Sequence, residues 1–432
     1  MKYAVVTFGC RVNQADSLGF EEALLTSGAE AGSEDSADLV IVNTCSVTAT
    51  ADQGARQVIR RIARVNPRAR IVVTGCYATR EPDEVRALPN VIRVVQNDDK
   101  HTLIASMMTT SERYGDGEGS CGAAIAPGVA GRTAFTLRVE TGCAEPCSYC
   151  IIPSTRGAPR SLPIDAVVAE VDRVIAAGFK EIALTGVHLG SYGRDLTPPS
   201  SLMGLVRALD NRSVLFRVSS LEPMDCPAAL VDFVASSDCF APHFHLPLQH
   251  ASDSILERMR RPYRIAQYAS LVNRVRRRMP HASIGSDVIV GFPGETDSDA
   301  DELASFLESS PLTHVHVFPY SDRPGTAASR MPEKVHGAVV RERARRIRDT
   351  GARLTRRFRE SQIGTVQRGL TIEDGSLVVT DNYLKVRIAT GRQRNERVSV
   401  RIGGTAEAMT GEIIGCQAPN AAAASCCAGD WR

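Results

Sequence analysis

Three short apolar runs alternate with helical patterns over roughly the first quarter of the chain. The runs are "KYAVVTF", "ADLVIVNT" and "RIVVTG", and the helical patterns after them extend to about Gly28, from Ala49 to Val65 and from Glu81 to Leu88. Continuous β-branched runs separated by helices are typical of a parallel sheet that is buried on both faces. We therefore predict an N-terminal parallel α/β domain over residues 1–115.

Each of these three runs leads into a cysteine, namely Cys10, Cys45 and Cys76. Parallel sheets bind ligands at the carboxyl ends of their strands, so three thiols that are distant in sequence should converge there. A single cysteine at a strand end is more often a small buried core residue. Repetition at all three strands favours the alternative, which is a soft-metal site of three thiolates.

Six further strand patterns follow, with helical patterns between them. The strands are "AFTLRVE", "KEIALTGV", "LFRVSS", "HFHLPL", "ASIGSDVIVGF" and "HVHVFPY". Repeated strand and helix units predict a partial (β/α)6 barrel over residues 132–360, with its active face at the strand carboxyl ends.

Short alternating strands replace this pattern from residue 361 to residue 416 and predict a small β-barrel. The low-complexity tail 417–432 is expected to be disordered. The predicted fold class is therefore α/β, with a parallel N-terminal domain, a partial barrel and a small C-terminal β-barrel.

Composition narrows the functional classes. The chain has 51 basic and 49 acidic residues, which excludes a globally cationic nucleic-acid binder but leaves local basic patches. The segment from Arg341 to Glu360 contains nine arginines and three acidic residues, and "RMRRPYR" and "RVRRR" add further basic groups. Together these segments predict a phosphate-contacting track for folded RNA.

The N-terminus "MKYAVVTFGCRVNQADS" has no signal-peptide pattern, and no stretch of eighteen apolar residues occurs. We therefore expect a cytoplasmic protein with no membrane association. Its 12 cysteines should be reduced there, which makes metal ligation the leading role for those that cluster. No partner spacing supports the others, which are Cys121, Cys226, Cys239, Cys416, Cys426 and Cys427.

The stretch "TGCAEPCSYC" after the first barrel strand holds Cys143, Cys147 and Cys150. A 4Fe–4S cluster normally takes four thiolates, so three leave one iron open to an external ligand. Zinc is the alternative, but structural zinc prefers paired Cys-x-x-Cys motifs with a fourth ligand near by, which this segment lacks.

This spacing, with Tyr149 before the last cysteine, resembles the radical S-adenosylmethionine (SAM) superfamily. Longer stretches are similar to the methylthiotransferases, including "NTCSVT", "TGCYA", "GCAEPCSYCIIPSTRG", "HLPLQ", "DVIVGFPGET" and "FPYSDRPGTAA". The forms "GCRVNQ" and "LTGVHLGSYG" most resemble the branch named for threonylcarbamoyladenosine in tRNA.

The resemblance implies two 4Fe–4S clusters. One, on Cys143, Cys147 and Cys150, would have SAM on its open iron and generate the radical. The other, on Cys10, Cys45 and Cys76, would carry the sulfur that becomes methylated. It also implies tRNA as substrate, attacked at C2 of a modified adenosine beside the anticodon, a C-terminal barrel of the TRAM type, an electron-donor protein and a sulfur source.

The resemblance also implies SAM contacts. These are Tyr149, Gly186 in the glycine-rich loop, Ser219, Ser220 and Glu222 near the ribose, and Gly291 and Gly294 near the adenine. Turns and strand-end capping are alternative roles for these residues. His188, His245 and His250 lie near predicted strand ends, where a lone histidine is usually structural, and we assign them no chemistry. His250 and Ala251 stand where the family usually has Ser-Gly.

Two kinds of alternative stay open from the sequence. The same chemistry would suit isopentenyladenosine in tRNA or an aspartate of a ribosomal protein. A non-catalytic iron–sulfur protein that binds RNA belongs to another class, and it would produce no 5′-deoxyadenosine from SAM.

Overall fold

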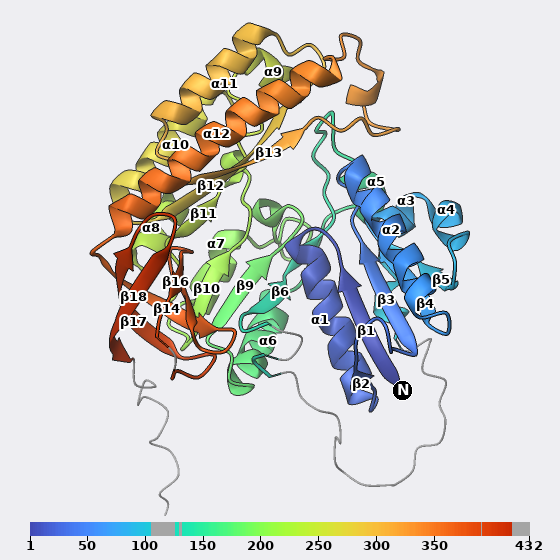
Figure 1. The fold of residues 1–432 in the computed structure, drawn as a ribbon. Coiled ribbons are helices and arrows are strands. Elements are labelled where there is room, and N and C mark those ends of the chain that lie inside the picture. The colour runs from blue at the N-terminus through green and yellow to red at the C-terminus, as the bar shows by residue number, and fades with distance from the viewer. Residues whose placement is uncertain (105–125, 129–131, 390, 417–432) are drawn as a thin grey trace, which may run out of the picture.

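The computed structural model describes residues 1–104, 126–128, 132–389 and 391–416. Figure 1 shows an N-terminal sheet, a curved central sheet with helices on its outer side, and a small C-terminal barrel. The predicted boundary at residue 115 and the predicted tail 417–432 lie outside the described residues. Within the described ranges, no helix has the length and apolar character needed to cross a membrane.

The N-terminal sheet has five parallel strands in the order β2-β1-β3-β4-β5. Its strands are β1 (Lys2–Thr7), β2 (Glu30–Ala31), β3 (Leu39–Thr44), β4 (Arg70–Gly75) and β5 (Val91–Val95). Its helices are α1 (Arg11–Thr26), α2 (Ala49–Val65), α3 (Cys76–Arg80) and α4 (Pro82–Arg86), followed by the 3-10 helix η1 (Asn97–Thr102). The parallel α/β domain is confirmed, although the sequence pattern indicated only its three central strands.

Alternation along β3 explains why this sheet is buried on both faces. Leu39 and Ile41 pack with residues of α1, whereas Val40 and Val42 pack with residues of α2. Successive side chains of a strand point to opposite faces, so a strand covered by helices on both sides is apolar throughout. The continuous apolar run of β3 thus packs against helices on both faces of the sheet.

The central sheet contains the six predicted strands, which form two parallel three-stranded sheets, β10-β9-β6 and β11-β12-β13. The strands are β6 (Phe135–Arg138), β9 (Glu181–Thr185), β10 (Leu215–Val218), β11 (His243–His245), β12 (Ser283–Val290) and β13 (His314–Pro319). Phe216 bridges the two halves by accepting a hydrogen bond from Ala241 N and donating one to Cys239 O. The result is one continuous partial barrel.

Helices cover the outer side of this barrel (Figure 1). They are α6 (Ile164–Ala176), α7 (Leu202–Leu209), α8 (Ala228–Ser236), α9 (Asp253–Arg258), α10 (Ile265–Arg278), α11 (Asp297–Ser309) and α12 (Gly337–Gln362). A short antiparallel pair, β7 (Glu140–Thr141) and β8 (Arg160–Ser161), flanks the five-residue helix α5 (Ile152–Arg156).

The C-terminal unit is a closed barrel of five strands in the order β14-β15-β16-β18-β17. Its strands are β14 (Val366–Ile372), β15 (Leu377–Thr380), β16 (Lys385–Arg387), β17 (Arg397–Gly404) and β18 (Met409–Cys416). Phe358 of α12 packs into the apolar interior of this barrel. A small β-barrel is therefore confirmed.

The positive charge of the α12 arginines is partly offset by acidic residues. Most of them pair with acids of the same chain, as Arg343 does with Glu295 and Arg353 with Glu308. Arg261, which the sequence placed in the RNA-facing track, is only 7% exposed. It therefore makes no part of an outer phosphate-binding surface.

Buried Arg217 of β10 joins the central and C-terminal barrels. Its Nε donates to Glu181 at 3.0 Å, and its Nη1 donates to the carbonyl of Asp381 at 2.9 Å. Its guanidinium also lies 4.9 Å from the ring centre of Tyr383. One buried cation therefore fixes the loop between β15 and β16 against the end of the barrel.

We predict that Arg217→Met lowers the free energy of unfolding by about 3–5 kcal/mol, because it leaves Glu181 buried without its partner. Urea unfolding of the purified protein measures the change. Adding Glu181→Leu should recover most of it. The exposed arginine of the Arg86–Asp83 pair is the control, and Arg86→Met should cost less than about 1 kcal/mol. Equal effects for both arginines would contradict this account.

Candidate functional site

The structure brings Cys10, Cys45 and Cys76 to one edge of the N-terminal sheet. Cys10 precedes α1, Cys45 directly follows β3, and Cys76 is the first residue of α3. A Cβ on Gly9 would lie only 2.6 Å from the Cys45 Sγ. Burial, together with the neighbouring Cys10 and Cys76 thiols, raises the pKa of the Cys45 thiol to about 11. The three sulfurs therefore form one electrostatically coupled group.

A glycine is required where β4 turns into α3. Gly75 has a φ of +99°, and a Cβ there would overlap the carbonyl oxygen of Thr44 on the neighbouring strand. Only glycine combines this left-handed conformation with such a close approach of two backbones. This turn places the Cys76 thiol beside that of Cys45.

The second trio lies on the loop between β7 and α5. Three N–H groups point at its sulfurs: Glu145 N is 3.4 Å from Cys143, Ile152 N is 3.4 Å from Cys150, and Arg261 Nη1 is 2.9 Å from Cys147. Donors of this kind stabilise thiolates rather than thiols. Each trio consists of soft sulfur donors, and both fit an iron–sulfur cluster with one open iron.

Charged residues that the sequence did not connect with the second trio surround it. Arg261 pairs with Glu222, and its pKa is raised by that carboxylate although burial lowers it. His188 Nε2 lies 2.7 Å from Asp225. Burial lowers the pKa of His188, but hydrogen bonds to Asp225 and Cys143 outweigh this effect and raise it to about 10. The cysteine loop is thus held between two cation–carboxylate pairs.

Helix α5 connects the two trios directly. It begins two residues after Cys150 and ends at Arg156, which is only 3% exposed. The Arg156 guanidinium donates to Asn13 of α1 at 2.5 Å and lies 3.4 Å from Asp16. Although burial lowers the pKa of Arg156, the Cys76 thiolate and the Asp16 carboxylate raise it overall.

The first trio lies beside a surplus of buried positive charge. Two buried cations, Lys100 and Arg156, and the partly exposed Arg138 all pair with the single carboxylate of Asp16. Asn97 adds a weaker donor, with its Nδ2 lying 3.7 Å from the Cys76 sulfur. Buried cations persist only when anions offset them. A 4Fe–4S core on three thiolates has net negative charge, so the surroundings of this trio fit such a cluster.

A cavity of about 200 Å³ reaches both cysteine loops. Its lining includes Val47 and Thr48, which follow Cys45, and Tyr149 and Cys150 of the second trio. The rest of its wall comes from Gln249, Asp287, Ile289, Phe318 and Tyr320 among others. Tyr149, Phe318 and Tyr320 give this cavity aromatic walls that suit a planar ring.

The residues expected to contact SAM differ in their neighbours and in their hydrogen-bond partners. Tyr149 lines the cavity. Ser220 Oγ is 2.8 Å from His245 Nδ1, and the buried Oγ of Ser219 has no hydrogen-bond partner among the described residues. Glu222 is engaged by Arg261. Ser219 thus keeps a free polar atom, whereas Ser220 and Glu222 already have protein partners.

The three predicted glycines are close to protein atoms. A Cβ on Gly186 would lie 2.6 Å from Glu140 Oε2, and one on Gly291 or Gly294 would overlap Val340 or Arg258. Close packing therefore accounts for these glycines, and their contact with SAM stays a prediction.

His250 fills a core position at the end of the barrel. It is fully buried, and its Nδ1 accepts a hydrogen bond from Ser252 N at 3.0 Å. Burial lowers its pKa to about 4, so the ring is neutral. The ring lies 3.7 Å from Glu295, which accepts hydrogen bonds from Gly291 N and Phe292 N. His250 and Ala251, which stand where the family usually has Ser-Gly, are therefore buried core residues.

Known proteins share both cysteine-bearing parts of the chain. Residues 2–96 match the model of an uncharacterized protein family, UPF0004, and residues 138–307 match the radical SAM superfamily. Threonylcarbamoyladenosine tRNA methylthiotransferase MtaB of Aquifex aeolicus is 36% identical over 411 residues, covering 90% of this chain and 96% of the relative. The chain belongs to the radical SAM methylthiotransferase family.

A second methylthiotransferase is also similar to this chain, and a solved structure shares its fold. The enzyme of the same name from Bacillus subtilis is 34% identical over 400 residues, with 88% of each chain covered. The radical SAM methyltransferase TsrM of Kitasatospora setae shares the fold, with a TM-score of 0.52, 17% identity and 76% of each chain covered. Radical SAM enzymes use SAM and a 4Fe–4S cluster, and methylthiotransferases of this family have two clusters.

We predict that Arg156→Met lowers the reduction potential of the cluster on the first trio, because reduction adds negative charge that this cation stabilises. One charge about 4–7 Å away, at an effective dielectric constant of about 20, corresponds to a shift of about 100–180 mV. Redox titration followed by electron paramagnetic resonance measures it.

Arg156→Lys should lower the reduction potential less than Arg156→Met does, because lysine keeps the positive charge. The control is Arg160→Met, because Arg160 is an exposed arginine on the same segment that pairs with Asp98. An unchanged potential in Arg156→Met would contradict the electrostatic role of Arg156.

Proposed function

We propose that this chain is a tRNA methylthiotransferase that adds a methylthio group to C2 of N6-threonylcarbamoyladenosine next to the anticodon. The observation that carries this proposal is the cavity, which touches the loop after Cys45 and the loop holding Cys150. A base held there lies between the two cysteine trios. Both relatives described above are named for this reaction.

When bound, the two clusters and SAM supply a 5′-deoxyadenosyl radical and a sulfur atom that becomes methylated. The chain itself holds these groups through Cys143, Cys147 and Cys150 and through Cys10, Cys45 and Cys76. Phe318 and Tyr320 stack on the target base and, together with Tyr149, exclude water from it. Anticodon-loop bases suit such a cavity, since they can leave their stack without breaking a duplex.

Partners outside the chain complete the reaction. Reductive cleavage of SAM consumes an electron, so an electron-donor protein is required, and the transferred sulfur must be replaced from a sulfur source. The C-terminal barrel, which we propose to be of the TRAM type, carries exposed Lys385, Arg387 and Arg401. These cations suit contact with the phosphates of tRNA.

Mass spectrometry of tRNA nucleosides tests the proposed acceptor. Cells without the gene should lack 2-methylthio-N6-threonylcarbamoyladenosine, because this protein carries out the step that inserts the sulfur. They should accumulate its unmethylthiolated precursor. Unchanged levels of that nucleoside, with loss of methylthio groups from isopentenyladenosine or from a ribosomal protein, would contradict the proposal.

Alanine variants of the two trios should separate the two halves of the chemistry. Cys147→Ala should abolish 5′-deoxyadenosine formation from SAM in the reduced protein. Cys45→Ala should retain SAM cleavage but form no methylthio product. Chromatography of both products measures this, and SAM cleavage that persists in Cys147→Ala would refute the assignment of the second trio.

A further inference from the structure

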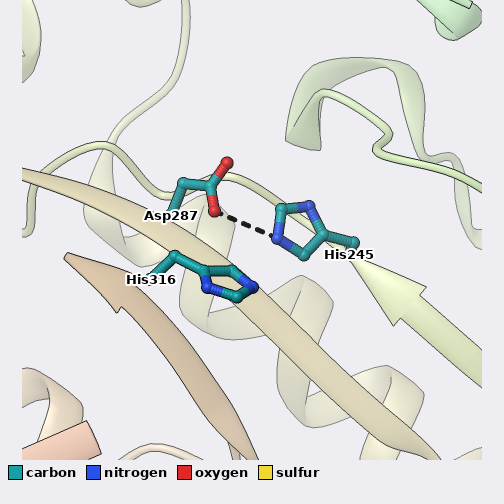
Figure 2. Close-up of side chains that lie close together, drawn as sticks. All are labelled: His245, Asp287 and His316. Atoms are coloured by element: carbon teal, nitrogen blue, oxygen red, sulfur yellow. Dashed lines mark ion pairs between the residues drawn. The ribbon is translucent and has the colours of Figure 1, made fainter. Parts of the chain in front are cut away.

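A second group of side chains lies on the inner face of the barrel (Figure 2). His245 of β11, Asp287 of β12 and His316 of β13 have ligand atoms within 4.8 Å of one another. His245 Nε2 is 3.1 Å from Asp287 Oδ1, and its Nδ1 is 2.8 Å from Ser220 Oγ. Both ring nitrogens of His245 therefore have partners.

His316 differs from His245 because its side chain is available to a ligand. It is exposed, and neither of its ring nitrogens has a hydrogen-bond partner among the described residues. Its ring centre lies 5.8 Å from that of His245. The second carboxylate oxygen of Asp287 likewise has no partner in the described part of the chain. The group thus presents one free donor side chain and one free acceptor oxygen.

Strand register places this group one layer below the aromatic cavity. Asp287 pairs with His316, and two residues further along, Ile289 pairs with Phe318. Residues two apart on a strand share a face and lie about 6.6 Å apart. Asp287, Ile289 and Phe318 all line the cavity. Asp287 is therefore the member of the group that the cavity reaches, and His316, its pairing partner on β13, lies at the same level.

Below this layer two further histidines and a tyrosine lie against one another. His243 and His314 stack with ring centres 6.2 Å apart, and Tyr383 of the C-terminal barrel lies 4.7 Å from His243. A group that reaches the level of His316 therefore meets polar side chains.

We propose that His316 and the His245–Asp287 pair bind the polar end of the N6 substituent of the target adenosine. The His316 N–H donates to the threonyl carboxylate, and the free oxygen of Asp287 accepts from the threonyl hydroxyl. This inference rests on the proposed function and adds the residues that distinguish a threonylcarbamoyl group from an apolar isopentenyl group.

Dimensions and chemistry both support this placement. From N6, the substituent spans a planar amide unit of about 3.8 Å and one carbon–carbon bond of about 1.5 Å, comparable to the spacing of the two layers. An isopentenyl group in the same place would leave His316 and Asp287 without partners. Sites built to hydrogen-bond a ligand reject analogues that lack the bonding group.

Binding of three anticodon stem-loop RNAs tests the inference. They share one sequence and carry threonylcarbamoyladenosine, isopentenyladenosine or adenosine at the target position. Fluorescence anisotropy measures their affinity for the holoenzyme with SAM but without reductant, so that no turnover occurs. The wild-type protein should prefer the threonylcarbamoyl form by about tenfold or more.

His316→Leu should reduce this preference to near unity, and His316→Gln should retain part of it because the amide still donates. The matched control is His281→Leu, an exposed histidine outside the group, which should keep the wild-type preference.

An unchanged preference in both His316 variants would overturn the inference while leaving the proposed function intact, provided that wild-type protein still methylthiolates the threonylcarbamoyl RNA. Absence of that product from the wild-type protein would refute both. One zinc ion per chain that is lost in His316→Leu would instead identify a metal site and overturn the inference.

Discussion

The structure depends on one topological constraint, which is that parallel strands of a sheet end at the same edge. In the N-terminal sheet this constraint brings Cys10, Cys45 and Cys76 together from three separate strands. In the barrel it places the Cys143–Cys150 loop and the cavity at the corresponding ends. The chemistry therefore lies between two sheet edges that face each other.

A charged side chain connects these two sheet edges. Arg156 belongs to the helix after the second trio, yet its guanidinium is buried against Asn13 and Asp16 of the first domain. Asn97 of the first domain adds a second contact, because its side chain donates a hydrogen bond to the Thr155 carbonyl at 2.7 Å. The contact that orients the domains is also the contact that surrounds the first trio with positive charge. Domain packing and cluster binding are consequently coupled.

The sequence predicted features that follow from local pattern. Continuous apolar runs identified β1, β3 and β4 and the six barrel strands, and the strand ends placed the cysteines. Edge strand β2 has only two residues, and β5 is half exposed, so neither has the pattern of a buried strand. The role of Arg261 was missed because its partners Cys147 and Glu222 are 114 and 39 residues away.

The group of His245, Asp287 and His316 likewise could not be predicted from local sequence pattern. Alternation in "HFHLPL" and "HVHVFPY" puts histidines on one face of each strand, but only the pairing of β11, β12 and β13 brings His245, Asp287 and His316 together. For arginine-rich α12, the local pattern could not show that acids of α11 pair with some of its arginines.

Iron content after anaerobic reconstitution tests the central claim most directly, namely that each cysteine trio holds its own cluster. Two four-iron clusters predict about eight irons per chain, and about four in a variant lacking the Cys10, Cys45 and Cys76 thiols. About four irons in the intact protein, unchanged by removal of those thiols, would contradict the account.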